Sequence, residues 1–145
     1  MKQPDPADRD AQGIGGNLRA DGLQALAARA LFEAGECFIR FRPRRMEDGL
    51  SVPLQLQLLP AEQLPMAKNE TLANGNEIIM GIEFNPIGRR VAYHFLRSHP
   101  GGVRQTQGWG TTRVPASEIM HLFTPLQEGQ IRGLPHTTPA MVKLW

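Results

Sequence analysis

The sequence predicts an α+β fold in which an N-terminal amphipathic helix packs on a mainly antiparallel sheet. Three observations lead to this prediction. Apolar residues recur at helical spacing near the N-terminus, several later segments alternate apolar and polar residues, and short turn sequences join those segments. Short connections bring neighbouring strands together as antiparallel hairpins, so we expect hairpin connectivity after the helix.

The predicted helix follows Asn17. Its apolar positions recur three or four residues apart and therefore lie on one face: Leu23, Leu26, Ala27, Ala30, Leu31 and Ala34. Gly35 provides a natural end to this helix, since glycine adopts the left-handed conformation that closes many helices.

Two strands are predicted next. The segment ECFIRFRPRR places Cys37, Ile39 and Phe41 on one face and Phe38, Arg40 and Arg42 on the other, and Pro43 ends it. In PLQLQLLP, leucines at 54, 56 and 58 alternate with glutamines, which is typical of a half-buried strand. AEQLP predicts a short helical turn, and residues 66–76 predict a polar loop.

The segment EIIMGIEFNPIGRRVAYHFL predicts a hairpin with its turn at NPIG. One face of the first arm carries Ile78, Met80, Ile82 and Phe84, and one face of the second carries Val91, Tyr93 and Phe95. TTRVPASEIMHLFTP adds two short strands around a turn at 115–117, giving five or six strands in all. We expect the helix to cover the sheet surface formed by the three leucines and the 78–84 face.

Two regions are expected in the chain. Residues 1–16 are rich in Gly, Asp and Pro and predict a flexible lead; the GIGG at 13–16 lacks the preceding strand and the following Lys-Ser/Thr pair of a phosphate loop. Residues 17–145 predict one α+β domain. Thr138-Pro139 is a typical helix start, yet the chain stops about two turns later, so we expect the domain to be incomplete at its C-terminus.

Composition limits the function classes. The 145 residues are 41% hydrophobic and 21% charged, as in ordinary globular domains, and no run approaches the roughly 18 apolar residues of a membrane span. The net charge of +2 argues against a dedicated DNA-coating protein. The single Cys37 excludes an internal disulfide and a cysteine zinc site, and fits a reducing, intracellular setting.

No residue pattern indicates catalysis. The four histidines (94, 99, 121 and 136) lack the spacing of a metal motif, and those at 94 and 121 fall on predicted strands, where a hydrogen-bonded structural role is common. A thiol nucleophile at Cys37 with either strand histidine as base is conceivable, but a buried, inert thiol fits better. Glu33 and Glu36 show no acid–base pattern. We expect no catalytic site, no cofactor and no metal.

An arginine cluster is the one suggestive charge feature. Arg40, Arg42, Arg44 and Arg45 fall within six residues, and arginine makes forked contacts to phosphate or carboxylate. Three interpretations remain open: a solvated strand edge, contact with nucleic-acid phosphate, and contact with an acidic neighbouring subunit. The residues alone therefore predict a binding or structural domain.

Five ordered motifs resemble the lambda-type family of tailed-phage portal proteins. They are ALFEAGECFIRFRPRR, VPLQLQLLPAEQLP, GNEIIMGIEFNPIGRRVAYHFLRSHPG, RVPASEIMHLF and GQIRGLPHTTPAM, and the resemblance runs from about residue 18 to residue 145. It implies a structural, non-enzymatic protein in the wing region of the portal. In the family this region is followed by the stem and clip, which line the channel and dock the terminase and which we expect this chain to lack.

The resemblance also implies partners and a location. Family members form a twelve-fold ring at one capsid vertex, through which DNA is packaged and ejected and to which the tail connector attaches. The implied partners are identical portal subunits, the terminase, and the capsid and head–tail connector proteins; DNA passes non-specifically and no membrane is involved. The implied location is the virion portal vertex, or the host cytoplasm for an expressed prophage fragment. The alternative is a small basic nucleic-acid-binding module that uses Arg40–Arg45.

Overall fold

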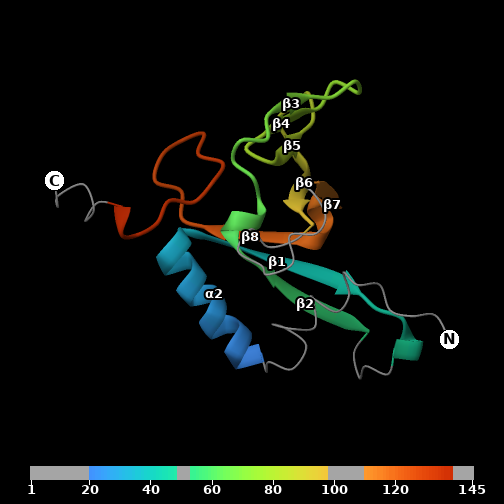
Figure 1. Cartoon of the computed structure of the whole chain (residues 1–145), viewed down its shortest axis with the longest axis vertical. Coiled ribbons are helices and arrows are strands. Elements are labelled where there is room, and N and C mark those ends of the chain that lie inside the picture. The colour runs from blue at the N-terminus through green and yellow to red at the C-terminus, as the bar shows by residue number, and fades with distance from the viewer. Residues whose placement is uncertain (1–19, 49–52, 98–109, 139–145) are drawn as a thin grey trace. The chain divides into compact units, whose positions relative to one another are not determined.

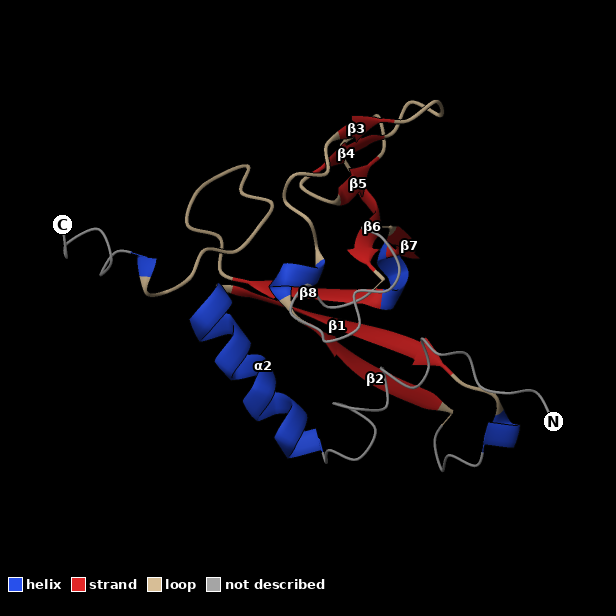
Figure 2. Cartoon of the chain, in the orientation of Figure 1, coloured by secondary structure: helices blue, strands red, loops and turns tan. Residues whose placement is uncertain are grey.

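In the computed structural model, residues 20–48, 53–97 and 110–138 are described (Figures 1 and 2). They form one long helix, two antiparallel sheets and three short 3-10 helices, which confirms the predicted α+β class. The chain divides into two compact units, one made of Met1–Ala61 with His121–Trp145 and the other of Glu62–Met120.

The helix α2 spans Ala20–Ala34, as the periodicity predicts, and packs against β1 (Figure 1). Ala27, on the predicted apolar face, is buried. Gly35 ends the helix with a positive φ of 79°, and its N–H donates to the Leu31 carbonyl over 3.0 Å. Glycine adopts this backbone conformation at little cost, which explains why the helix ends here.

The first sheet has the strand order β2-β1-β8, with β1 at Glu36–Pro43, β2 at Leu54–Leu59 and β8 at Ile119–Phe123. The antiparallel register pairs Phe41 with Leu56 and Arg42 with Gln55. Successive residues of a strand point to opposite faces, so Leu54, Leu56 and Leu58 share one face of β2, as the alternation predicts, while Leu59, the buried residue of this strand, shares the other face with the two glutamines. The 3-10 helices η1 (Met46–Asp48) and η2 (Ala61–Gln63) flank β2 in sequence.

The second sheet has the order β3-β4-β5-β6-β7. Its strands are β3 at Glu70–Thr71, β4 at Glu77–Ile79, β5 at Ile82–Phe84, β6 at Arg90–Leu96 and β7 at Thr111–Pro115. The prediction of a loop over 66–76 is therefore wrong at β3. The prediction of one sheet is also wrong, because the hairpin strands belong to a sheet separate from β2.

The first arm of the predicted hairpin folds back on itself. Met80 and Gly81 have φ of 49° and 82°, and Ile79 pairs with Ile82 across them, so they are the two central residues of a tight hairpin. Positive φ at both positions is typical of the type I′ turn. Ile78 pairs with Glu83 and therefore faces the opposite side from Ile82. The prediction that Ile78, Met80, Ile82 and Phe84 share one face is therefore wrong.

The NPIG turn and the β7–β8 connection follow the prediction. The Asn85 N–H donates to the Arg89 carbonyl and the Gly88 N–H donates to the Asn85 carbonyl, each over 2.9 Å. Gly88 has a φ of 78°. The 3-10 helix η3 spans Ala116–Glu118 between β7 and β8, where the turn was predicted.

A backbone crossing joins the end of α2 to the C-terminal segment. A Cβ placed on Gly133 would lie 2.1 Å from the Gly35 carbonyl oxygen, and one placed on Gly35 would lie 2.0 Å from the Leu134 carbonyl carbon. Both distances are far below van der Waals contact, so these positions accept only glycine without movement of the backbone. The segment that follows β8 therefore passes directly over the β1 start.

Several expectations concern residues outside the described ranges. These are the flexible lead at 1–16, the histidine at 99 and, apart from Thr138, the helix predicted to start at Thr138-Pro139. Among the described residues, no helix has the length and apolar character needed to cross a membrane.

Candidate functional site

A buried carboxylate, Glu36, lies at the start of β1 where the C-terminal segment crosses. Its side chain is 3% exposed. Arg132 Nε donates to Oε1 over 2.7 Å, and Arg132 Nη2 donates to the same oxygen. Oε2 accepts the Gly133 N–H over 2.9 Å and lies 3.0 Å from His121 Nε2. The carboxylate thus binds groups that are 85 to 97 residues away along the chain.

The partners of Glu36 are equally enclosed. The side chains of Arg132 and His121 are 5% and 2% exposed. The His121 ring stacks on the Phe38 ring with 4.3 Å between their centroids. The Phe123 ring is tilted against the His121 ring, with 4.6 Å between those two centroids. The Arg132 guanidinium lies 5.8 Å from the Phe38 ring centroid, which adds a cation–π contact. We call Glu36, His121, Arg132 and Gly133 the Glu36 cluster.

The charge of Glu36 is held by this geometry. Burial by itself would raise the pKa of Glu36, but hydrogen bonds from His121, Arg132 and Gly133 outweigh burial and hold that pKa below its usual value. A forked guanidinium contact favours the ionised carboxylate. The Glu36 cluster is therefore a buried ionic contact that links β1 to the C-terminal segment.

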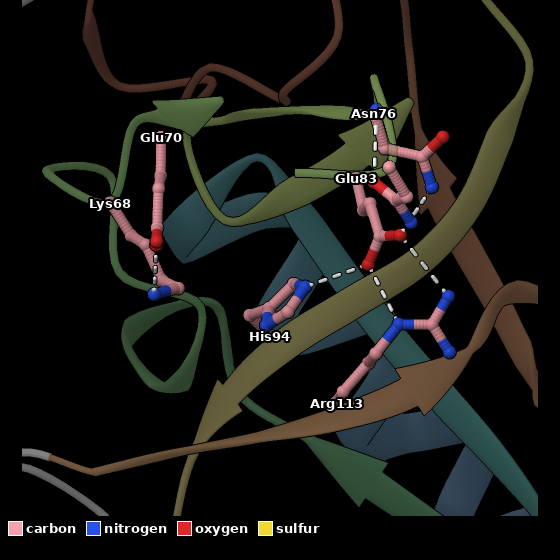
Figure 3. A network of polar contacts seen from close by, with 7 residues as sticks. Lys68, Glu70, Asn76, Glu83, His94 and Arg113 are labelled. Atoms are coloured by element: carbon pink, nitrogen blue, oxygen red, sulfur yellow. Dashed lines mark hydrogen bonds and ion pairs between the residues drawn. The ribbon is translucent and has the colours of Figure 1, made fainter. Parts of the chain in front are cut away.

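A second buried carboxylate, Glu83, orders the other unit (Figure 3). Its side chain is 1% exposed. Arg113 Nε donates to Oε2 over 2.7 Å and Arg113 Nη2 to Oε1 over 3.2 Å. Asn76 Nδ2 donates to Oε1 over 2.7 Å, and His94 Nε2 lies 2.9 Å from Oε2. We call these four residues the Glu83 cluster.

Strand register explains how the Glu83 cluster forms. Glu83 pairs with Ala92 on β6, and His94, two residues further along β6, pairs with Arg113 on β7. The side chains of Glu83, Ala92, His94 and Arg113 therefore lie on one face of the sheet. Ala92 is fully buried and has only a methyl group. Because so little side chain stands between β5 and β7 there, the Arg113 guanidinium reaches across β6 to the carboxylate.

The pKa of Glu83 falls to about 2, chiefly because of the Arg113 hydrogen bonds, with further lowering by Asn76 and His94 against the opposing effect of burial. The carboxylate in turn raises the pKa of Arg113. The two groups therefore remain an ion pair throughout the neutral and mildly acidic range.

The arginine cluster lies on β1, the central strand of the first sheet, and in the segment that directly follows it. Arg40 and Arg42 pair with Gln57 and Gln55, so these four side chains share one face of β1 and β2. Arg44 follows β1, and both its Nε (2.9 Å) and Nη2 donate to Gln55 Oε1. Arg45 is exposed. The structure therefore brings guanidinium and amide groups together, and we call Arg40, Arg42, Arg44, Gln55 and Gln57 the arginine strip.

The residues considered for catalysis have structural surroundings. Cys37 is fully buried, and burial raises the pKa of its thiol to about 11, as expected for an inert thiol. His94 and His121 each lie within hydrogen-bond distance of a buried carboxylate, which confirms the predicted structural role. Among the described residues, no group of three or more His, Cys, Asp or Glu side chains could hold a metal ion.

Sequence analysis missed both carboxylate clusters. Their partners come from segments that local patterns do not connect, such as Arg132 with Glu36. One local signal was present: Glu36 and Glu83 each stand next to apolar strand residues. A charge in such a position is rarely buried without a partner.

The clusters and sheets define an α+β fold in which buried polar groups link strands to a crossing segment. The chain belongs to the lambda family of phage portal proteins, whose family model matches residues 6–145. That family is structural and non-enzymatic. The chain is 34% identical over 83 residues to a protein described as a probable portal protein of Halomonas phage phiHAP-1. The match covers 57% of this chain and 16% of that relative.

The Glu83 cluster generates a prediction on pH. The folded pKa of Glu83 lies below the roughly 4.3 of an unfolded chain, so its contribution to stability is present above that value and is lost as the pH falls toward 2. In an NMR titration of the Glu83 carboxyl carbon, we expect a midpoint near pH 2 in the parent chain and an upward shift of about one unit or more in Arg113→Gln.

Arg97→Gln provides the control, because Arg97 is also exposed and directly follows β6. This change should leave the Glu83 midpoint unmoved. A parent midpoint near 4, or equal shifts in both variants, would show that Arg113 does not hold this carboxylate.

Proposed function

We propose that this chain supplies the wing region of a phage portal subunit, within the ring at the capsid vertex through which DNA is packaged and ejected. The observation that carries this proposal is the family match over residues 6–145. The portal role in the relative's printed name supports it over part of the chain. In this proposal the partners are identical subunits, the terminase, and the capsid and head–tail connector proteins, and the location is the virion.

The fold suits a structural element under load. Each unit is stabilised by a buried carboxylate with several charge-assisted donors, and breaking such a buried pair is strongly destabilising. The Glu36 cluster also fixes the course of the chain where it continues past the sheet. A region with such buried networks is expected to resist local opening, as a structural element requires.

The proposal predicts that peptides from residues 20–138 occur in purified phage particles of the producing strain. Quantitative mass spectrometry against the major capsid protein should give a small, fixed number of copies per particle, because a portal occupies one vertex. Immunogold labelling should mark a single vertex. Particles that lack these peptides, while the protein is present in the cell, would contradict the proposal.

A second candidate function is nucleic-acid binding by the arginine strip. The observation that favours it is the shared face of Arg40, Arg42, Gln55 and Gln57, with Arg44 bonded to Gln55. A phosphate-binding strip shows affinity that falls steeply with salt.

Fluorescence anisotropy with labelled duplex DNA separates the two candidates. The portal proposal predicts only weak binding at physiological salt, and little difference between Arg42→Ala/Arg44→Ala and the control Arg29→Ala/Arg97→Ala. Tight binding at physiological salt that the strip variant alone abolishes would favour the nucleic-acid module.

A further inference from the structure

Two ordered turns each present one exposed aliphatic side chain beside one exposed charge. The turn between β5 and β6 presents Ile87, which is 85% exposed, with the exposed Arg89 two residues later. The turn after β8 presents Leu126, which is 72% exposed, with the exposed Glu128 two residues later. In both turns the charged residue follows the exposed aliphatic residue by two positions, and the two charges have opposite signs.

The Ile87 turn is fixed by its own hydrogen bonds. Besides the two backbone bonds that close it, the Arg89 N–H donates to Asn85 Oδ1 over 2.8 Å. Pro86 restricts φ before the exposed residue, and Gly88 supplies the positive φ after it. Ile87 is thus held outward on a rigid turn, so little conformational entropy is lost when a partner covers it.

The Leu126 turn is fixed through the Glu36 cluster. The Leu126 N–H donates to Gln130 Oε1 over 2.7 Å, and Gln130 Nε2 donates to the Arg132 carbonyl over 2.7 Å. The Gln130 N–H also donates to the Gln127 carbonyl, and Gly129 has a φ of 75°. The buried Arg132 therefore anchors a turn that presents an apolar side chain to solvent.

We propose that the Ile87–Arg89 turn of one copy docks on the Leu126–Glu128 turn of a second copy of this chain. The partner is a second copy because this chain carries both complementary turns. Ile87 of one copy would contact Leu126 of the other, and Arg89 would pair with Glu128. Two different surfaces meet in such a contact, so it is heterologous and builds a ring when the rotation closes. The inference rests on the proposed portal function and names the subunit contact that this function requires.

The test is self-association of the 145-residue chain, measured by sedimentation velocity over a range of concentrations. Arg89→Glu and Glu128→Arg should each weaken association by roughly tenfold or more, since each puts like charges at the contact. The double variant Arg89→Glu/Glu128→Arg restores the opposite charges and should return association to near the parent value. Ile87→Ser and Leu126→Ser should also weaken it.

Matched controls are Glu62→Arg and Met46→Ser, which change an exposed acid and an exposed apolar residue outside both turns. Both should associate like the parent chain. A chain that stays monomeric at every concentration, single reversals without effect, or a double variant as weak as the singles would overturn the inference. Detection of the protein in virions with any of these results would leave the portal function standing and reject this contact alone.

Discussion

A carboxylate that is almost entirely removed from water must be matched by donors from the protein, and Glu36 imposes that requirement where three parts of the chain meet. Arg132, His121 and the Gly133 N–H meet it, and they come from the two segments that follow the second unit in sequence. The glycine crossing at 35 and 133 then allows the backbones to approach closely enough for these bonds. Because loss of Arg132 would leave a buried carboxylate without its counter-charge, the cluster favours this path for the C-terminal segment.

The second unit uses the same physical solution in a different setting. Glu83 is matched by donors from β6, β7 and the loop before β4, and the small side chain of Ala92 opens the space in which they meet. In both units, then, an ionised carboxylate links elements that are separate in the sequence and adds to the register that the buried apolar residues already favour. A polar network that is fully satisfied favours one strand register over its neighbours, since a shifted register would bury the charge unpaired.

Local patterns were enough to predict the helix, the strands β1 and β2, the NPIG turn and the α+β class, because each depends on residues close in sequence. The break at Met80–Gly81 was not predictable this way: EIIMGIEF alternates like a continuous strand, and the turn is supported by Asn69 Oδ1, which accepts the Met80 N–H from 11 residues away. The Glu36–Arg132 pair spans 96 residues and has no local signature beyond a charge beside an apolar run. The arginine face was predicted from alternation, while its role stays a prediction.

The central claim is that the Glu36–Arg132 pair holds the C-terminal segment in place, and a double-mutant cycle on urea unfolding tests it most directly. Glu36→Gln and Arg132→Met should each lower the free energy of unfolding by about 3–5 kcal/mol, and the double variant should lose at least ~2 kcal/mol less than their sum. The exposed pair Arg29–Glu33, 72% and 58% exposed, gives the control cycle, with an expected coupling below ~0.5 kcal/mol. A coupling between Glu36 and Arg132 as small as that of the surface pair would contradict the account.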